Sequence, residues 1–248
     1  MTNFKNSKLF WKDIKSITVK ENNYYNIDTK DFFNYFKSVF QKHSCPPSIC
    51  FESNQTPYYT FDNQNESFFA LNSDITREEV ENSLSMIKSS KSPGTDRILN
   101  EMLKSTSLEI TPFLISLFNH NFRKHIFPNE WKKSIIVPIH KKGNVNVCSS
   151  FRPISLTSLL SKTYTNILNK RLTNFVESND ILPIEQGGFR ENYSTVDHIF
   201  TLYSMIHKQF SKDQKLYVAF VDYSKCFDTV DKDALFNVLE KMVLMAQF

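Results

Sequence analysis

The sequence predicts an α/β (α+β) fold in which helices far outnumber strands. Apolar residues recur at helical spacing over most of the chain, whereas only two short apolar runs are typical of strands. With 40% hydrophobic and 23% charged residues among 248, the chain has the composition of an ordinary globular protein. The expected helices are 31–40, 76–93, 111–127, 159–176, 197–210 and a helix after Asp231, and the expected strands are 135–137 and 216–221.

Composition also bears on the compartment. No apolar run approaches the ~18 residues that a membrane span needs, and residues 1–20 are too polar for a signal peptide. We therefore expect an intracellular protein of the cytoplasm or nucleus without membrane contact. The cysteines form no C-x-x-C pair, which argues against a disulfide framework and against a zinc site. They are Cys45, Cys50, Cys148 and Cys226.

Charge and glycine content point to further features. The chain has 30 Lys and Arg against 26 Asp and Glu, a net charge of +4, which permits nucleic-acid binding without proving it. Only four glycines occur, where a usual share of ~7% would give about 17. Each glycine is therefore expected at a turn or at a close approach of the backbone.

We divide the chain near residue 70, into an N-terminal extension of residues 1–70 and a main domain of residues 71–248. Within the extension, Phe32, Phe33, Phe36, Val39 and Phe40 share helical spacing and predict an amphipathic helix that docks onto another element. Residues 44–64 are rich in Pro, Ser, Asn and Gln and predict a linker.

The main domain begins with two expected helices. Thr76 followed by Glu79 forms a capping box, and an apolar face continues from there until Pro93 and Gly94 stop the helix. The second helix should begin at Thr111 with Pro112 in its first turn, where the missing N–H is tolerated. The apolar faces are Val80, Leu84 and Ile87 in the first helix, and Phe113, Leu114, Leu117, Phe118 and Phe122 in the second.

Strands and further helices follow. Pro138 directly after residues 135–137 places that strand at the edge or end of a sheet. The helices 159–176 and 197–210 each have one apolar face and should be half-buried. Residues 216–221 form an unbroken apolar run, short enough for a strand buried on both faces.

Asp222 ends that apolar run. A carboxylate after a buried strand can present chemistry at the edge of a sheet, although an aspartate in this position can also cap a helix. Asp231 suits the capping role, because Ala234, Leu235, Val238, Leu239 and Met242 follow it as a helical face.

Five stretches, in this order and spacing, resemble the reverse transcriptases of non-LTR (LINE-type) retrotransposons, closest to the jockey and chicken-repeat branches. No single stretch would suffice. Residues 10–12 and 31–40 also resemble the segment that precedes the polymerase in these polyproteins. The five stretches are residues 92–96 (SPGTD), 131–143 (WKKSIIVPIHKKG), 151–157 (FRPISLT), 186–195 (QGGFRENYST) and 220–228 (FVDYSKCFD).

The resemblance implies a partial right-hand polymerase, with helix-rich fingers and the first strand and helix of the palm. It implies RNA-directed DNA polymerisation by two-metal nucleotidyl transfer. The implied substrates are an RNA template, a DNA primer and deoxynucleoside triphosphates.

The same resemblance implies roles for individual residues. Asp222 and the backbone carbonyl of Tyr223 would bind Mg²⁺, which prefers hard oxygen ligands. Arg152, with its planar fork, and Lys141 would hold the triphosphate, although Lys142 can take the place of Lys141.

Further roles concern the sugar and the template. Phe227 would pack beneath the nucleotide sugar and exclude a 2'-hydroxyl, or it is an ordinary core residue. Gly187 and Gly188 would let the backbone lie close to a template strand, with Arg190 as a phosphate contact, or they form a plain turn.

One departure from the family is serious. The second catalytic motif, an aromatic-Ala-Asp-Asp hairpin, does not occur in this sequence, nor does a thumb. We therefore expect a truncated polymerase that is inactive alone. Two alternatives stay open: a non-catalytic RNA-binding remnant or pseudogene product, and a fragment of a group II intron maturase.

Overall fold

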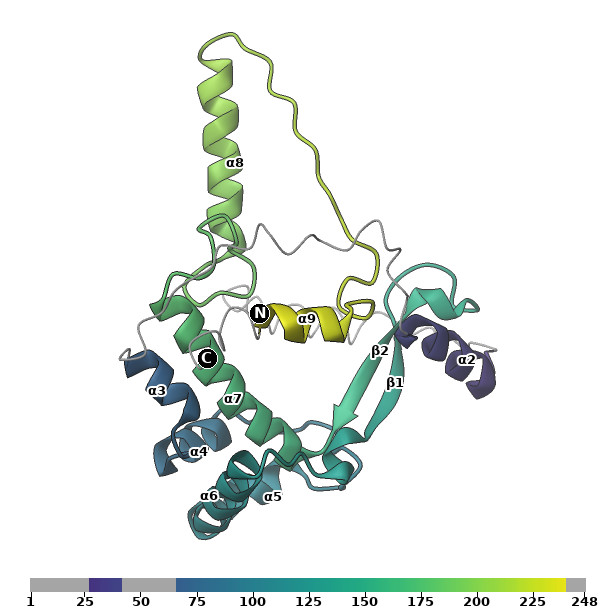
Figure 1. The fold of residues 1–248 in the computed structure, drawn as a ribbon. Coiled ribbons are helices and arrows are strands. Elements are labelled where there is room, and N and C mark those ends of the chain that lie inside the picture. Colours follow the sequence, from purple (N-terminus) through teal and green to yellow (C-terminus); the bar gives the residue numbers. More distant parts are fainter. Residues whose placement is uncertain (1–26, 42–65, 240–248) are drawn as a thin grey trace, which may run out of the picture. The chain divides into compact units, whose positions relative to one another are not determined.

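A computed structural model of the chain describes residues 27–41 and 66–239, a helix-rich structure with one small sheet (Figure 1). The chain divides into two compact units, described separately here. The first contains residues 1–41 and 136–155, and the second contains residues 42–135 and 156–248. The expected boundary near residue 70 stays a prediction. The expected linker 44–64 and the motif at 10–12 lie outside the described residues.

The first unit is built around helix α2, Thr29–Phe40. Phe32, Phe36 and Val39 are buried, and the ring of Phe32 meets that of Phe151 edge-on at 5.0 Å between centroids. The expected amphipathic helix is thus confirmed. Its apolar face is narrower than expected, because Phe33 and Phe40 are exposed.

Strands β1 (Ser134–His140) and β2 (Phe151–Thr157) form a two-stranded sheet. The Lys141 amide donates to the Ser150 carbonyl at 2.9 Å beside the short connection, so the strands run antiparallel. Each strand therefore has one edge that pairs with no other strand in the described part of the chain. Proline cannot donate to a ladder and is tolerated in such an edge strand, as at Pro138 of β1. The expected edge strand is confirmed and is longer than residues 135–137.

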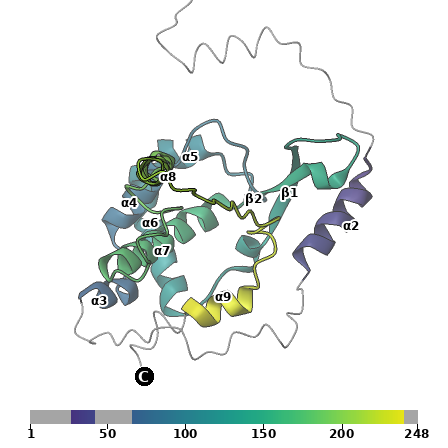
Figure 2. The same cartoon turned by 90° about the horizontal axis from the view of Figure 1, so that it is seen from above.

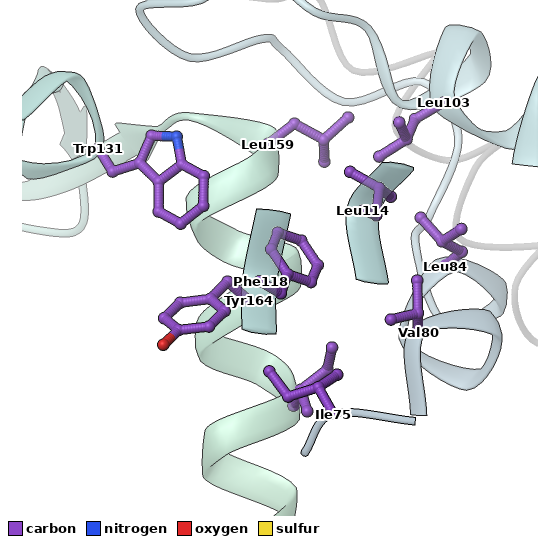
Figure 3. Close-up of a cluster of buried hydrophobic side chains, with 10 residues drawn as sticks. Ile75, Val80, Leu84, Leu103, Leu114, Phe118, Trp131, Leu159 and Tyr164 are labelled. Carbon is purple, nitrogen blue, oxygen red and sulfur yellow. The ribbon is translucent and has the colours of Figure 1, made fainter. Parts of the chain in front are cut away.

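The core of the second unit lies among helices that pack side by side in both views (Figures 1 and 2). Aromatic rings fill its centre: Phe118 lies 5.3 Å from Tyr164 and 6.0 Å from Trp131 between centroids (Figure 3). The elements are α3 (Glu66–Asn72), α4 (Arg77–Ser85), α5 (Asn100–Ser105), α6 (Ser107–Arg123), the 3-10 helix η2 (Asn129–Lys132) and α7 (Leu159–Ser178).

Helix α4 has the expected capping box, in which the Thr76 amide donates to Glu79 at 2.8 Å and the Glu79 amide donates to Thr76 at 3.2 Å. The helix nevertheless ends at Ser85, well before Pro93. A tertiary hydrogen bond holds the chain after this helix, in which Asn100 Nδ2 donates to the Lys88 carbonyl at 2.6 Å. Ser90, two residues further on, has a left-handed φ of 58°, which is not helical.

Helix α6 begins at Ser107, not at Thr111, and Pro112 lies inside it. Proline removes one helical N–H, so the carbonyl of Leu108 loses its usual partner. Leu108 is exposed, and water can satisfy that carbonyl. Leu114 and Phe118 are buried as expected, whereas Phe113 and Leu117 are exposed.

Helices α7, α8 (Thr195–Phe210) and α9 (Lys232–Leu239) form where expected. Asp231 Oδ1 caps α9 by accepting from the amides of Asp233 at 2.9 Å and Ala234 at 3.1 Å. Met242, expected on that face, lies outside the described residues. No residue of α8 is buried, so its expected half-burial is wrong for Ile199 and Tyr203, which are exposed.

The expected strand 216–221 is also wrong. Residues 214–223 have extended backbone without a ladder, and the side chains of Tyr217 and Val221 are 87% and 78% exposed. A strand exists only through hydrogen bonds to a neighbour. In the described part of the chain, β1 and β2 pair with each other and neither pairs with this segment.

Candidate functional site

The SPGTD stretch at residues 92–96 packs against the start of α7. A Cβ on Gly94 would lie 2.1 Å from the Thr157 carbonyl oxygen, so only glycine permits this approach. Asp96 Oδ2 accepts the amide hydrogen of Leu159 at 2.9 Å, at the first residue of α7. Two of the five stretches are thus joined. The sequence did not lead us to predict this role of Asp96. The available signal was a carboxylate two residues after the glycine of a turn.

Three cations gather where the β1–β2 hairpin turns. Lys141 and Lys142 are the first two residues after β1, and Arg152 is the second residue of β2. All three side chains are exposed. Side chains alternate along a strand, so Lys141 and Arg152 lie on the face of the hairpin opposite Phe151. None of the three side chains has a hydrogen bond or ion pair with another described residue, so each can meet an anionic ligand.

Arg190 is already engaged. Its Nε and Nη2 donate to the two carboxylate oxygens of Glu177 at 3.0 and 2.7 Å, and its Nη1 donates to the Pro183 carbonyl at 3.1 Å. The guanidinium also lies 4.6 Å from the centre of the Tyr193 ring. The hydrogen bond between the two groups raises the pKa of Arg190 and lowers that of Glu177. In this arrangement Arg190 orders the loop after α7, and a phosphate would have to compete with Glu177.

The paired glycines have different surroundings. A Cβ on Gly187 would lie 2.5 Å from His198 Nε2, so this backbone closely approaches a side chain of α8. A Cβ on Gly188 would meet nothing nearer than Gln186 Nε2 at 3.4 Å. The backbone at Gly188 is therefore the one with room for a ligand.

The structure brings the glycine loop to the segment that carries Asp222. Phe189 and Phe227 meet edge-on with 5.4 Å between ring centroids. Asp222, Tyr223 and Phe227 are exposed, and residues 224–229 form turns. Lys141, Lys142 and Arg152 belong to the first unit, whereas these residues belong to the second.

The described residues do not fit a pair of metal ions. Over residues 27–41 and 66–239, no group of three or more His, Cys, Asp or Glu side chains could hold a metal ion. Two divalent ions at close range need several bridging anionic oxygens. Asp222 and the Tyr223 carbonyl do not complete such a site in the described chain.

Comparisons with known proteins agree with the motifs. Residues 139–247 match the family described as reverse transcriptase (RNA-dependent DNA polymerase). The protein named "Probable RNA-directed DNA polymerase from transposon BS" of Drosophila melanogaster is 33% identical over 169 residues, which are 68% of this chain and 19% of that relative. The "RNA-directed DNA polymerase from mobile element jockey" of the same species is 29% identical over 212 residues, 82% of this chain and 22% of the relative.

The match and the relatives define a class: the chain carries part of a reverse transcriptase domain. Within that class, the relatives confirm the predicted resemblance to the non-LTR (LINE-type) retrotransposon enzymes. It spans about a fifth of the length of these curated relatives. Enzymes of this family generally use a divalent metal ion. In the described residues, no helix is long and apolar enough to cross a bilayer.

Proposed function

We propose that this chain is the fingers and first catalytic segment of an RNA-directed DNA polymerase that copies retrotransposon RNA into DNA. The observation that carries the proposal is the pair of Lys141 and Arg152, which are exposed on one face of the hairpin and have no counter-ion among residues 27–41 and 66–239. Cations held on a sheet without carboxylate partners suit phosphate groups of a nucleotide or nucleic acid. The family match supports the same role.

The roles of single residues follow from their chemistry. Arg152 offers a planar fork to two oxygens of the incoming triphosphate, and Lys141 or Lys142 adds a point charge. Asp222 and the Tyr223 carbonyl are proposed as two of the several oxygen ligands that Mg²⁺ needs. Phe227 is proposed to exclude a ribose 2'-hydroxyl, and the Gly187–Gly188 backbone to lie along the template.

The first experiment measures binding of single-stranded RNA between about 50 and 200 mM salt. Each phosphate contact that is lost should lower the salt slope of affinity by ~0.7, so the double variant Lys141→Gln with Arg152→Gln should lose about 1.4. The matched control is Lys124→Gln with Arg97→Gln, which removes the same charge elsewhere. A slope near zero for the unaltered chain would contradict the proposal.

The second experiment concerns catalysis. With a single carboxylate, the 248-residue polypeptide should not extend a primer, because losing ~4 kcal/mol of transition-state stabilisation costs about 10³-fold in rate. A fusion that adds a homologous second motif and thumb should extend a DNA primer on RNA with Mg²⁺. Asp222→Asn should abolish that activity, and Asp228→Asn serves as control. Activity in the Asp222→Asn fusion would remove the proposed role of Asp222.

In the same fusion, Phe227→Ala should raise incorporation of ribonucleotides relative to deoxyribonucleotides. Phe220→Ala, a second exposed phenylalanine of this segment, is the control. If sugar selectivity does not change in a folded variant, Phe227 only packs against Phe189.

One further candidate is a chain that binds RNA without catalysis, a role that the exposed cations Lys141 and Arg152 would serve equally well. RNA binding that depends on Lys141 and Arg152, together with an inactive fusion, would support that reading.

A further inference from the structure

The second unit contains a pocket of about 690 Å³ between the end of α4 and one face of α7. Its described lining comes from residues 83–100 and 159–169 and includes Lys88, Lys91 and Lys162 but no carboxylate. Such a volume lies in the range of small-molecule and cofactor sites. The pocket therefore has the size of a ligand site and a cationic rim.

The three lysines lack partners in the described chain. Lys88, Lys91 and Lys162 are exposed, and none of them forms a hydrogen bond or ion pair with another described residue. Two other lysines of this unit do have carboxylate partners: Lys170 pairs with Glu191 at 2.5 Å, and Lys133 pairs with Glu130 at 2.7 Å. The rim therefore presents three positive charges at one pocket without a described counter-ion.

The floor of the pocket is fixed by hydrogen bonds. Asn166 Nδ2 donates to Ser83 Oγ at 3.3 Å, and Ser83 Oγ donates to the Thr163 carbonyl at 3.1 Å. Asn100 Nδ2 holds the backbone carbonyl of Lys88 at 2.6 Å. These bonds link α4, α5 and α7, so the pocket is formed before a ligand arrives.

The walls combine apolar surface with one uncommitted amide. Ile87, Met86 and Leu159 contribute apolar surface. Asn169 lies seven residues after Lys162 on α7 and so shares its helical face. The Asn169 amide has no hydrogen bond to another described residue, and it can both donate and accept.

We propose that this pocket binds one nucleotide unit of a single-stranded RNA, an inference that rests on the proposed function. The apolar wall receives the base, the lysine rim holds the flanking phosphates, and Asn169 bonds a base edge or a 2'-hydroxyl. An RNA strand fits this rim better than a free nucleotide does. Lys162 lies on α7, whereas Lys88 and Lys91 lie on the chain after α4, so successive phosphates of one RNA strand can contact them. The pocket belongs to the second unit, whereas the hairpin cations belong to the first.

The experiment measures binding of a labelled oligouridylate to the full 248-residue chain between about 50 and 200 mM salt. The triple variant Lys88→Gln, Lys91→Gln, Lys162→Gln should lower the salt slope by about 2 and weaken binding by at least about tenfold at the lowest salt. The charge-matched control replaces three exposed lysines outside the pocket, Lys124, Lys132 and Lys208, with Gln. It should change the slope by less than half as much.

A second variant fills the pocket without changing charge. Thr165→Trp places an indole from α7 into the pocket and should weaken binding severalfold with an unchanged salt slope. Thr201→Trp on α8 is the matched control, because both threonines are exposed and each donates to the carbonyl four residues earlier at 2.9 Å.

Competition identifies the source of the nucleotide. Unlabelled oligouridylate should displace the label, whereas uridine triphosphate at the same nucleotide concentration should not. If uridine triphosphate competes equally well, the pocket binds a free nucleotide, and the proposal that it binds an RNA strand is wrong. If the chain binds RNA but the triple variant equals its control, the pocket is overturned and the proposed function stands. If the chain binds no RNA, the proposed function itself fails.

Discussion

Helices α7 and α8 have the same kind of sequence pattern and different surroundings. Both are amphipathic, and both form over the residues that the pattern predicts. In α7, Tyr164, Ile167 and Phe175 are buried, because α3 and α4 pack against it. In α8 no residue is buried.

The difference between α7 and α8 shows which features of a helix depend only on residues nearby in the sequence. Helix starts are satisfied in both regions: the Thr76 amide donates to Glu79 before α4, and the Ser194 amide donates to Asp197 before α8 at 2.7 Å. These bonds need only residues three apart. Burial needs a second surface, and the described chain supplies one for α7 but not for α8.

The largest expected effect contrasts two phenylalanines across these regions. Phe118 is fully buried among Trp131 and Tyr164, so Phe118→Ala should lower the free energy of unfolding by about 3–5 kcal/mol. Phe200→Ala, on the exposed face of α8, should change it by less than about 0.5 kcal/mol. Urea unfolding followed by circular dichroism measures both. Equal losses would mean that α8 is packed as tightly as α6.

The next effect contrasts two arginine ion pairs of the core region. Arg171 has a side chain only 7% exposed, bonds Glu79 at 2.6 and 2.8 Å and donates to the carbonyls of Ser73 and Asp74. Arg171→Met leaves these acceptors unpaired and should cost about 2–4 kcal/mol, discounted because Glu79 is partly exposed. Arg123→Met breaks an ion pair with Asp74 whose arginine is 63% exposed, and should lower the free energy of unfolding much less, because solvent screens the pair. Urea unfolding of both variants measures the two effects. Equal losses of unfolding free energy would contradict the conclusion that burial makes the Arg171 ion pair the more stabilising one.

A smaller effect separates two glycines. Gly94→Ala forces a methyl group against the backbone of Thr157 and should cost about 1–3 kcal/mol. Gly188→Ala meets only the flexible end of Gln186 and should stay within about 0.5 kcal/mol. Thermal unfolding suffices as the measurement. A neutral Gly94→Ala variant would show that the loop at Gly94 and the backbone of Thr157 can move apart.

The smallest effect concerns pH. Burial opposes ionisation of Glu79, but hydrogen bonds from Arg171 and Thr76 outweigh it and hold the pKa of Glu79 below its ordinary value of 4.5. A carboxyl whose folded pKa is lowered contributes stability above its unfolded pKa and loses it as the pH falls through the folded pKa. Stability should therefore fall below about pH 4.5. Glu79→Gln should remove part of that slope, as measured by urea unfolding at a series of pH values.

Several site features could be predicted because they depend on neighbours in sequence. The edge strand with Pro138, the cap at Asp231 and the family motifs fall in this group. The hairpin cations could be named, and their shared face follows from strand alternation. The occupation of Arg190 by Glu177 could not be predicted, since the two residues lie 13 apart and on different elements. The roles assigned to Asp222 and Phe227 stay predictions.

The sequence by itself determined the capping of helices at Thr76 and Asp231, which helix faces are apolar and which family the chain resembles, because these depend on short-range spacing and residue type. Only the tertiary structure decided which apolar faces are covered. It ended α4 early through Asn100, tied Asp96 to α7 and assembled a lysine-rimmed pocket from residues far apart in the chain. It also left residues 216–221 without a strand partner. Burial and strand pairing require a second surface, and the position of that surface is fixed by packing rather than by the local pattern.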